Sequence, residues 1–364
     1  MKLTNKQVMV HTFDGRAKMR LEETGKYDAL FSPEHLYNET KKSKERGWIY
    51  ANVTNKDLSA YITLGYDDLQ RYLFHELRYK GKTYRIGEGF CNDSTKFGDG
   101  MFTIKEEGRE VDWKGSPSEY EVTAKFRKKG PASEGELKLT YKFEKLSDEI
   151  KKFKCIFKEF DQILAYWMIS PAKGSIEIEG KGDISLFQLG EAEELIGKNI
   201  ASNFSYNENI HMRTPMISQG WHWTILDCFQ EDEQKIEKFV SFMHFFFERG
   251  KYQIPIFIQL INWDPETGEA EVFEDAETKL KWESPKTPLL SVKSKEGKIE
   301  LKITPKYEID VHSIRGMKLA NLILKTDIDY NTYPCNAEVV IGNKKYTAIG
   351  SSEITGAGRT GYWL

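Results

Sequence analysis

Most of the side chains that could do chemistry lie in one stretch of the chain. It begins with Tyr206, Glu208 and His211 and continues, after a short gap, with Trp221-His222-Trp223 and Asp227. Carboxyl and imidazole groups can move protons, and aromatic rings can hold an apolar molecule. We therefore expect the functional site to be built from this stretch.

Asp227 is the group whose surroundings matter most. If residues 221–229 form a strand, alternate side chains point to opposite faces. One face then carries Trp221, Trp223, Ile225, Asp227 and Phe229, and the other carries His222, Thr224, Leu226 and Cys228. A carboxyl group in an apolar wall resists ionisation, so Asp227 could stay protonated near neutral pH and act as a general acid toward an alkene or ether.

Two interpretations of this face remain open. In one, the indole faces of Trp221 and Trp223 stabilise a developing carbocation by cation–π attraction while Asp227 supplies the proton. In the other, Asp227 is a hydrogen-bonded structural group at a strand end and the two tryptophans belong to the core.

The polar residues around Asp227 have several interpretations of their own. Glu208 and His211 could form an acid and base pair at a cavity mouth, or could bond to loop backbone. With His222 they could also ligate a metal ion, but the eleven-residue spacing of the histidines and the lack of a third histidine make this a weak motif. His244 lies in an apolar strand pattern that is also typical of a core histidine.

Our prediction for the site combines these residues. We expect Asp227, Glu208 and His211 to be catalytic. We expect the ligand to be contacted by Tyr206, Trp221, His222, Trp223 and His244. We expect neither a cofactor nor a metal ion, because the chain has no phosphate-binding loop, dinucleotide fingerprint or nucleophile motif.

Composition narrows the class of partner. The 53 basic and 56 acidic residues leave a formal net charge of -3, which lacks the electrostatic footprint of a nucleic-acid binder. No stretch approaches the roughly 20 apolar residues of a transmembrane helix, and the first residues do not form a signal peptide. We therefore expect a cytoplasmic protein with a hydrophobic small-molecule ligand; its oligomeric state stays open.

The elements that must position these residues read as strands. Leu137, Leu139, Tyr141 and Phe143 alternate with polar residues, which is typical of half-buried antiparallel strands. Glycines such as Gly81 and Gly108 stand where short hairpin turns need a positive φ. Helical patterns are few and short, the better ones being Ser147–Phe153, Glu191–Gly197 and Glu231–Phe239.

Three segments carry apolar side chains on both faces, namely Tyr61–Leu77, Phe239–Phe247 and Ile254–Trp263. Such strands must be covered on both sides, as in a barrel that is also packed from outside. The interior could hold a ligand or be a solid core. Because 364 residues exceed the size of one ordinary core, we expect an all-β protein of two consecutive antiparallel barrels or sandwiches, residues 1–215 and 216–364, with a few short helices.

Several segments together resemble a known family. Arg46–Val53 looks like its opening strand, with Gly47 at the customary acid position. Gly174–Gly180 and Tyr206–Asn209 are similar to a strand and an aspartate-histidine-x-tryptophan-glycine signature, with Asn209 where histidine is usual. Gly220–Trp223 and Gly350–Tyr362 resemble the strands that open and close the second domain.

The family that these segments resemble is the double-lipocalin family of hydroxyneurosporene synthase, also called carotenoid 1,2-hydratase, and its fungal cyclase relatives. The resemblance implies two lipocalin-like barrels and an apolar cavity for an isoprenoid, polyketide or lipid-like molecule. It also implies that hydration, isomerisation or cyclisation would proceed without a cofactor.

Three functions are therefore compared below. The first is binding of a hydrophobic molecule in a β-barrel cavity, with acid-catalysed hydration, isomerisation or cyclisation. The second is a non-catalytic carrier of the same ligand class. The third is a carbohydrate-active β protein, for which Trp113, Trp263 and Trp282 would be exposed sugar platforms.

Overall fold

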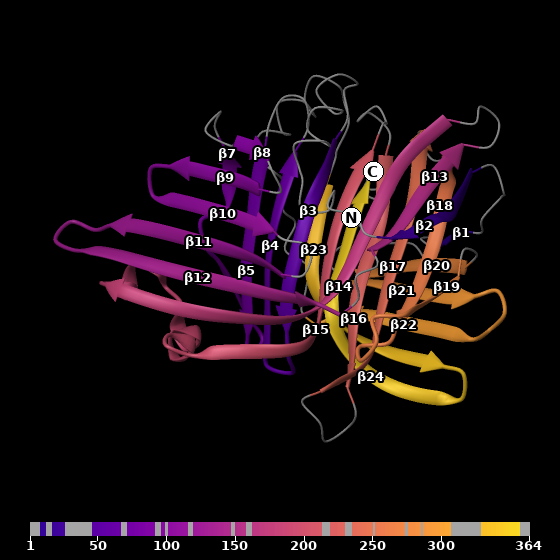
Figure 1. Cartoon of the computed structure of the whole chain (residues 1–364). Helices are drawn as coiled ribbons and strands as arrows, with labels where there is room; N and C mark the ends of the chain where they lie inside the picture. The colour runs from indigo at the N-terminus through magenta and orange to yellow at the C-terminus, as the bar shows by residue number, and fades with distance from the viewer. Residues whose placement is uncertain are drawn as a thin grey trace.

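The structure is a computed structural model of the chain. It describes residues 8–11, 17–25, 46–66, 71–91, 96–98, 101–115, 119–146, 150–157, 162–212, 219–229, 235–249, 252–273, 276–284, 287–306 and 329–356. In this part, nearly all residues belong to two antiparallel sheets, which lie side by side in Figure 1. This confirms the predicted all-β, two-sheet fold.

The first sheet contains fourteen strands of the described chain. In spatial order its main path is β6 (Lys82–Arg85), β5 (Arg71–Tyr79), β4 (Leu58–Tyr66), β3 (Arg46–Thr54), β15 (Asn199–Met212), β14 (Gln162–Gly182), β12 (Glu134–Lys145), β11 (Glu119–Lys129), β10 (Arg109–Gly115), β9 (Met101–Glu106) and β8 (Lys96–Gly98). Off this path, β13 (Ile150–Phe157) pairs with β14, β2 (Ala17–Gly25) with β13, and β7 (Gly89–Cys91) with β5.

The second sheet contains ten strands of the described chain. Their order is β1 (Val8–His11), β20 (Ala276–Ser284), β21 (Thr287–Ser294), β22 (Ile299–Pro305), β23 (Asp329–Ile341), β24 (Lys344–Gly356), β16 (Gln219–Phe229), β17 (Ile236–Arg249), β18 (Tyr252–Trp263) and β19 (Ala270–Phe273). Because β18 also contacts β20, this sheet nearly closes into a barrel.

The chain passes from the first sheet to the second between β15 and β16, across residues 213–218, which are outside the described part. The division into residues 1–215 and 216–364 stays a prediction. One crossing runs the other way, because β1 pairs with β20 in the second sheet.

Two of the predicted helical segments are wrong in their described parts. Ile150–Phe157 is strand β13, paired with β2 and β14, and Ile236–Arg249 is strand β17. The helices of the described residues are the 3₁₀ turns η2 (Ile184–Phe187) and η3 (Gly190–Leu195), the latter overlapping the predicted segment Glu191–Gly197. A short amphipathic stretch becomes a strand when partner strands on both sides bury its apolar residues.

The turn between β5 and β6 shows how local chemistry closes the hairpins. Lys80 and Gly81 both have positive φ, 46° and 80°, which is the two-residue turn that matches the right-handed twist of the flanking strands. Glycine adopts this conformation without steric cost.

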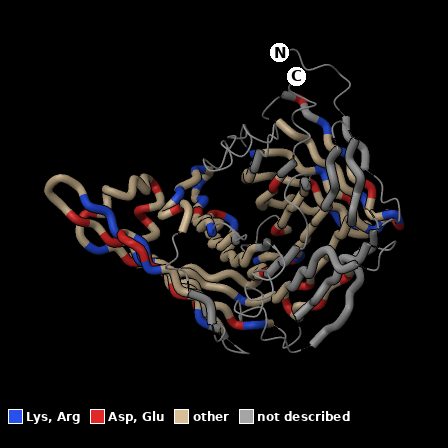
Figure 2. Tube along the Cα trace, turned by 90° about the horizontal axis from the view of Figure 1, so that it is seen from above, with Lys and Arg blue, Asp and Glu red and all other residues tan. Residues whose placement is uncertain are grey.

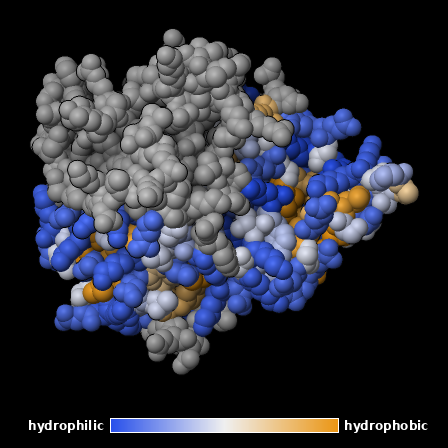
Figure 3. All heavy atoms as spheres, turned by 180° about the vertical axis from the view of Figure 1, so that it is seen from behind, coloured by the Kyte–Doolittle hydropathy of each residue, from blue (hydrophilic) through white to orange (hydrophobic). Residues whose placement is uncertain are grey.

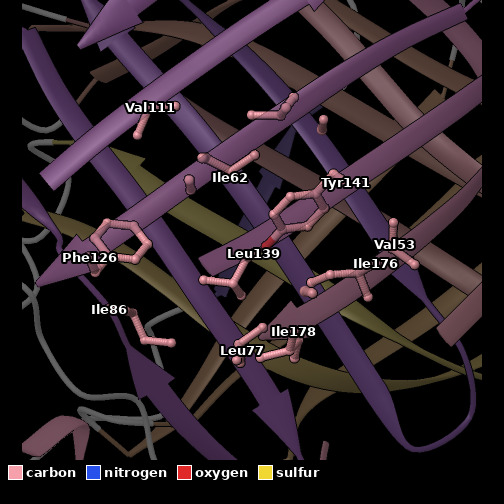
Figure 4. Close-up of a cluster of buried hydrophobic side chains, with 14 of the residues drawn as sticks. Val53, Ile62, Leu77, Ile86, Val111, Phe126, Leu139, Tyr141, Ile176 and Ile178 are labelled. Carbon is pink, nitrogen blue, oxygen red and sulfur yellow. The ribbon is translucent and has the colours of Figure 1, made fainter. Parts of the chain in front are cut away.

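Each sheet encloses an apolar core of its own. In the first, side chains from β4, β5, β10, β11, β12 and β14 fill the interior, among them Ile62, Leu77, Val111, Phe126, Leu139 and Ile178 (Figure 4). The second core contains, for example, Leu226, Phe242, Leu280, Leu301 and Val339. Outside these cores, residues of both charge signs are interspersed along the strands of the first sheet (Figure 2). Seen from behind, hydrophilic residues surround smaller hydrophobic patches (Figure 3).

Candidate functional site between the two sheets

A third buried cluster lies between the sheets, and we call it the seam. The first sheet supplies Tyr50, Tyr61, Ile169, Phe204 and Tyr206, and the second supplies Trp223, Ile225, Phe229, Ile236, Phe239, Met243, Ile261 and Trp263. The three segments predicted to be apolar on both faces each lie here. On β17, for example, Phe239 faces the seam while Val240 faces the second core.

The faces of β16 are as predicted from its alternation. Trp223, Ile225 and Phe229 face the seam, whereas Leu226 and Cys228 belong to the second core. Trp221 packs against the seam from its partly exposed end. Asp227 falls in this alternation between Ile225 and Phe229.

Aromatic rings from the two sheets interlock across the seam. Tyr50 meets Trp223 edge-on with ring centroids 5.2 Å apart, and Tyr206 stacks on Phe239 at 5.3 Å. Nearer the partly exposed end, Trp48 stacks on Trp221 at 5.6 Å. Since aromatic pairs at these separations are favourable contacts, the rings hold the two sheets together.

Glu208 is a buried carboxyl group bound by three neutral donors. Its Oε1 accepts from the Trp48 indole N–H at 2.7 Å, and its Oε2 accepts from the Tyr206 hydroxyl at 2.6 Å and from the Trp223 indole N–H at 3.3 Å. An ionised carboxylate only accepts hydrogen bonds, so these donors match that form. Glu208 is therefore held as a hydrogen-bond acceptor beside three aromatic rings.

A second acidic group lies under the same indole pair. The Trp221 N–H donates to Oε2 of Glu353 on β24 at 3.2 Å. The stacked pair Trp48–Trp221 is thus tied to one carboxyl group in each sheet. Such an arrangement presents indole faces and negative charge together, which suits a cation.

Asp227 is the buried acid of the seam. It is only 2% exposed, and burial raises its pKa to about 8. None of the described residues hydrogen-bonds to its Oδ1. Asp227 is therefore largely protonated at neutral pH, as predicted for a carboxyl in an apolar wall.

Tyr50 lies among the charged groups of the seam. Burial raises the pKa of its hydroxyl well above the usual value; Arg78 opposes this change, and Glu208, Glu353 and Asp227 add to it. The hydroxyl has no hydrogen-bond partner among the described residues. It is consequently a neutral O–H donor inside the site.

Glu76 and Arg78 form a buried ion pair on β5, and Arg78 also reaches across the seam to the second sheet. Arg78 donates to Glu76 at 3.0 Å on its own strand, and to Thr332 at 3.3 Å and to Ser351 on the second sheet. Its guanidinium lies 5.2 Å from the centroid of the Tyr61 ring. The cation is thus satisfied by both sheets at once.

The predicted site residues do not all meet. Tyr206, Glu208, Trp221, Trp223 and Asp227 lie along the seam. His222 and His244 face each other inside the second barrel, fully buried, with ring centroids 5.4 Å apart. The backbone of His211 pairs with Gly47 and Tyr166, and its side chain is outside the described part. Whether the two buried histidines contact a ligand stays a prediction.

Three seam residues escaped sequence reasoning. Tyr50 lies inside the segment Arg46–Val53, where it looked like one strand aromatic among several. Glu76 and Arg78 are two residues apart on a strand whose other face is apolar, with Leu73 and Leu77 in the first core. Two opposite charges at this spacing in an otherwise apolar strand could have predicted a buried ion pair, since buried charges need partners.

Hollows lined by described residues lie at the edge of the seam and on the first sheet. One of about 60 Å³ touches Arg78, Cys335, Ile349 and Gly350 at the edge of the seam. Another of about 800 Å³ lies on the first sheet, with Tyr120, Phe143 and Lys142 among its walls. The rings around Tyr50 and Trp223 are in mutual contact.

Metal and membrane features can be judged only for the described part. There, no group of three or more His, Cys, Asp or Glu side chains is arranged to hold a metal ion. None of its helices is long and apolar enough to span a membrane.

The sugar-platform interpretation is wrong for two of its three tryptophans. Trp113 is 2% exposed in the first core, and Trp263 is fully buried in the seam with its N–H donating to Ser241 at 3.0 Å. The side chain of Trp282 is outside the described part. A sugar ring needs an exposed indole face, which neither Trp113 nor Trp263 offers.

Comparison with known proteins gives similarity in structure alone. Neither a protein-family profile nor a curated protein sequence matches the chain. Among solved structures, CghA with Sch210972 superposes with a TM-score of 0.51 at 8% identity, covering 86% of this chain and 88% of that one. Kievitone hydratase from Nectria haematococca gives a TM-score of 0.50 at 9% identity, covering 93% and 98%. At such identities the likeness shows a shared fold.

Proposed function

We propose that the protein binds a hydrophobic, isoprenoid-, polyketide- or lipid-like molecule and adds a proton to it, leading to hydration, isomerisation or cyclisation without a cofactor. The observation that carries the proposal is Asp227, a buried carboxyl group with a raised pKa on the same strand face as Trp223. A protonated acid beside aromatic rings is what protonation of an alkene requires. The structural neighbours, one solved with a small molecule and one a hydratase, agree with this class.

The chemistry would follow from the groups of the seam. The Asp227 proton goes to one alkene carbon, and the electron pair of the double bond leaves the other carbon cationic. The indole faces and the Glu208 carboxylate stabilise this cation. Water adds to the cation and returns a proton to the Asp227 carboxylate. Alternatively, a second double bond attacks and closes a ring, and the new cation then loses a proton to the Asp227 carboxylate.

Entry of a ligand would begin at the partly exposed end of the seam. Trp48 and Trp221 are half-buried rings packed against the cluster, whereas Tyr50, Tyr206 and Trp223 are buried. Because the described rings interlock, we propose that this indole pair separates to admit the ligand. His211, whose backbone lies on the same strand as Glu208, and the barrel histidines His222 and His244 are proposed as secondary contacts.

The test is the isosteric change Asp227→Asn. Substrates are first sought by mass spectrometry of apolar compounds that co-purify with the protein and by incubation of unsaturated isoprenoids and polyketides in H₂¹⁸O. The variant should lose at least about a hundredfold in product formation, since general acid catalysis contributes about 10²–10⁴-fold. Ligand binding, followed by quenching of tryptophan fluorescence, should be retained.

Asp112→Asn is the matched control. Asp112 accepts a hydrogen bond from Thr103 at 3.1 Å on the first sheet, outside the seam cluster, so this variant should keep full turnover. Unchanged product formation by Asp227→Asn would refute the acid role. A wild-type protein that binds its co-purified ligand and returns it unaltered would favour the carrier function instead.

A further inference from the structure

The most informative polar atom of the seam is the Tyr50 hydroxyl. Tyr50 is 4% exposed, and its ring is held by Tyr61 at 5.6 Å and by Trp223 at 5.2 Å between centroids. Its hydroxyl oxygen is buried with no hydrogen-bond partner among the described residues. Native proteins pair more than nine in ten of their buried polar groups, so an orphan hydroxyl in a site points to a ligand atom.

Tyr206, in the same cluster, shows the ordinary arrangement. Its ring lies 6.3 Å from that of Tyr50, and its hydroxyl donates to Glu208 at 2.6 Å. The two phenols thus differ in their hydrogen bonding. The Tyr206 hydroxyl is bound to Glu208, whereas the Tyr50 hydroxyl has no partner among the described residues. The Tyr50 oxygen is not required to stabilise the fold, since a phenylalanine ring would fill the same space.

The orphan hydroxyl has a second unpaired polar atom in its cluster. Oδ1 of Asp227 also lacks a partner among the described residues, and the Asp227 charge is close enough to affect the Tyr50 hydroxyl. At neutral pH the Tyr50 phenol is a donor without an acceptor among the described residues, and Asp227 is largely protonated. A phenol beside a protonated carboxyl is a donor set that enzymes use to bind a ketone oxygen.

We propose that the Tyr50 hydroxyl donates a hydrogen bond to a carbonyl oxygen of the ligand, so that the site selects conjugated ketones over hydrocarbon polyenes. This inference rests on the proposed binding function and narrows its ligand class. A neutral donor suits an acceptor such as a carbonyl oxygen and offers nothing to a hydrocarbon. In a conjugated ketone the carbonyl draws electrons from the adjacent double bond, so water would add to the carbon β to the carbonyl and Asp227 would protonate the α carbon. The proton lost by the water would return to the Asp227 carboxylate.

The experiment compares Tyr50→Phe with Tyr206→Phe, which remove the same atom from neighbouring rings. Because the Tyr50 hydroxyl has no hydrogen-bond partner among the described residues, Tyr50→Phe should leave the melting temperature unchanged or raised. Tyr206→Phe should lower it by about 3–6 °C, because it deletes a bond to a carboxylate. Both are measured by thermal unfolding without ligand.

Selectivity for a ketone is then measured with two probes, trans-chalcone and trans-stilbene. Both have two phenyl rings and a double bond, but only chalcone has a ketone. Quenching of tryptophan fluorescence gives both affinities. The wild type should bind chalcone about tenfold more tightly than stilbene, the value of one hydrogen bond. Tyr50→Phe should lose this preference by weakening chalcone alone, whereas Tyr206→Phe should keep the ratio.

Four results would overturn the inference. They are a wild type that binds neither probe, equal affinity of the wild type for both, a Tyr50→Phe variant with the wild-type ratio, and a fall in melting temperature of Tyr50→Phe that matches Tyr206→Phe. The catalytic proposal is tested separately, by product formation. Asp227→Asn should lose turnover whether or not the Tyr50 hydroxyl binds a ketone oxygen. Binding of chalcone through Tyr50 with no product would leave the inference standing and remove the catalysis.

Discussion

At the scale of single residues, the seam contains buried polar groups of two kinds. Some are hydrogen-bonded within the protein, and others have atoms without a hydrogen-bond partner among the described residues. Glu208 is bound by Trp48, Tyr206 and Trp223, and is therefore fixed in place. Asp227 and the Tyr50 hydroxyl are buried without partners for their orphan atoms in the described part. A protein tolerates such groups where function requires them, because each costs about 1–3 kcal/mol when unpaired.

The raised pKa of Asp227 predicts how stability depends on pH. The carboxyl has a reference pKa of 3.8 and a folded value of about 8, so the unfolded chain binds fewer protons between these values. The contribution of protonated Asp227 to the free energy of unfolding is thus full below about pH 4 and falls as the pH rises to about 8. Urea unfolding at pH 5 and pH 8.5 should show a loss of a few kcal/mol in the wild type.

Asp227→Asn cannot titrate, so it should lose less stability over this range than the wild type. Asp112→Asn, outside the seam, should follow the wild type. Parallel curves for all three proteins would mean that Asp227 is ionised in the folded state. The same titration should reduce turnover above about pH 8, where the acid has given up its proton.

A contact of a site residue could be predicted from the sequence only where the residues in contact are close together along the chain. The environment of Asp227 follows from alternation along one strand, because its neighbours Ile225 and Phe229 are set by the two-residue period. The partners of Glu208 could not be foreseen, since Trp48 is 160 positions away and Trp223 is on the other sheet. The orphan state of Tyr50 is likewise a property of the packed seam.

At the scale of elements, periodicity identified the strands while tertiary pairing decided the ambiguous segments. Tyr61–Leu77 is apolar on both sides because β4 and β5 carry the first core on one face and the seam on the other. Ser147–Phe153 could be read as a helix because the pairing of its residues 150–153 with β2 involves residues far away in the chain. Propensity alone cannot record such a partner.

The approach of β24 to β16 makes a prediction at this scale. A Cβ added to Gly350 would lie 1.8 Å from the backbone carbonyl oxygen of Ile225, so Gly350→Ala must push the two strands apart. We expect the free energy of unfolding to fall by more than about 2 kcal/mol, since backbone atoms cannot move aside cheaply. Chemical denaturation followed by circular dichroism measures this loss.

Gly65→Ala is the control, because Gly65 also lies in a strand but its added Cβ would meet only ordinary contacts at 3.8 Å. It should be neutral or should stabilise the fold by about 0.5–1 kcal/mol, as alanine loses less conformational freedom than glycine. Equal effects of the two substitutions would contradict a close approach of β24 to β16.

At the scale of the whole molecule, the two sheets form one unit because the seam has both an apolar and an ionic part. The aromatic cluster buries rings from each sheet, and Arg78 joins them through Thr332 and Ser351. The all-β architecture with two antiparallel sheets was predicted from the sequence, and the placement of the functional residues where the halves meet stays a prediction. Which strands face each other across that junction depends on the packing of the two sheets.

Removing the seam cation tests this union. Arg78→Met leaves the Glu76 carboxylate, 3% exposed in its side chain, with Arg85 as its cationic partner among the described residues, and Arg85 is 35% exposed. Breaking a buried pair in this way costs about 3–5 kcal/mol. The double variant Glu76→Leu with Arg78→Met should lose less free energy of unfolding than the single one, because no buried charge is left uncompensated.

The measurement is urea unfolding followed by tryptophan fluorescence, which reports the seam, and by circular dichroism, which reports both sheets. The two transitions should coincide in the wild type. If the single variant is as stable as the wild type, or the double variant is the weaker of the two, the ion pair does not hold the sheets together.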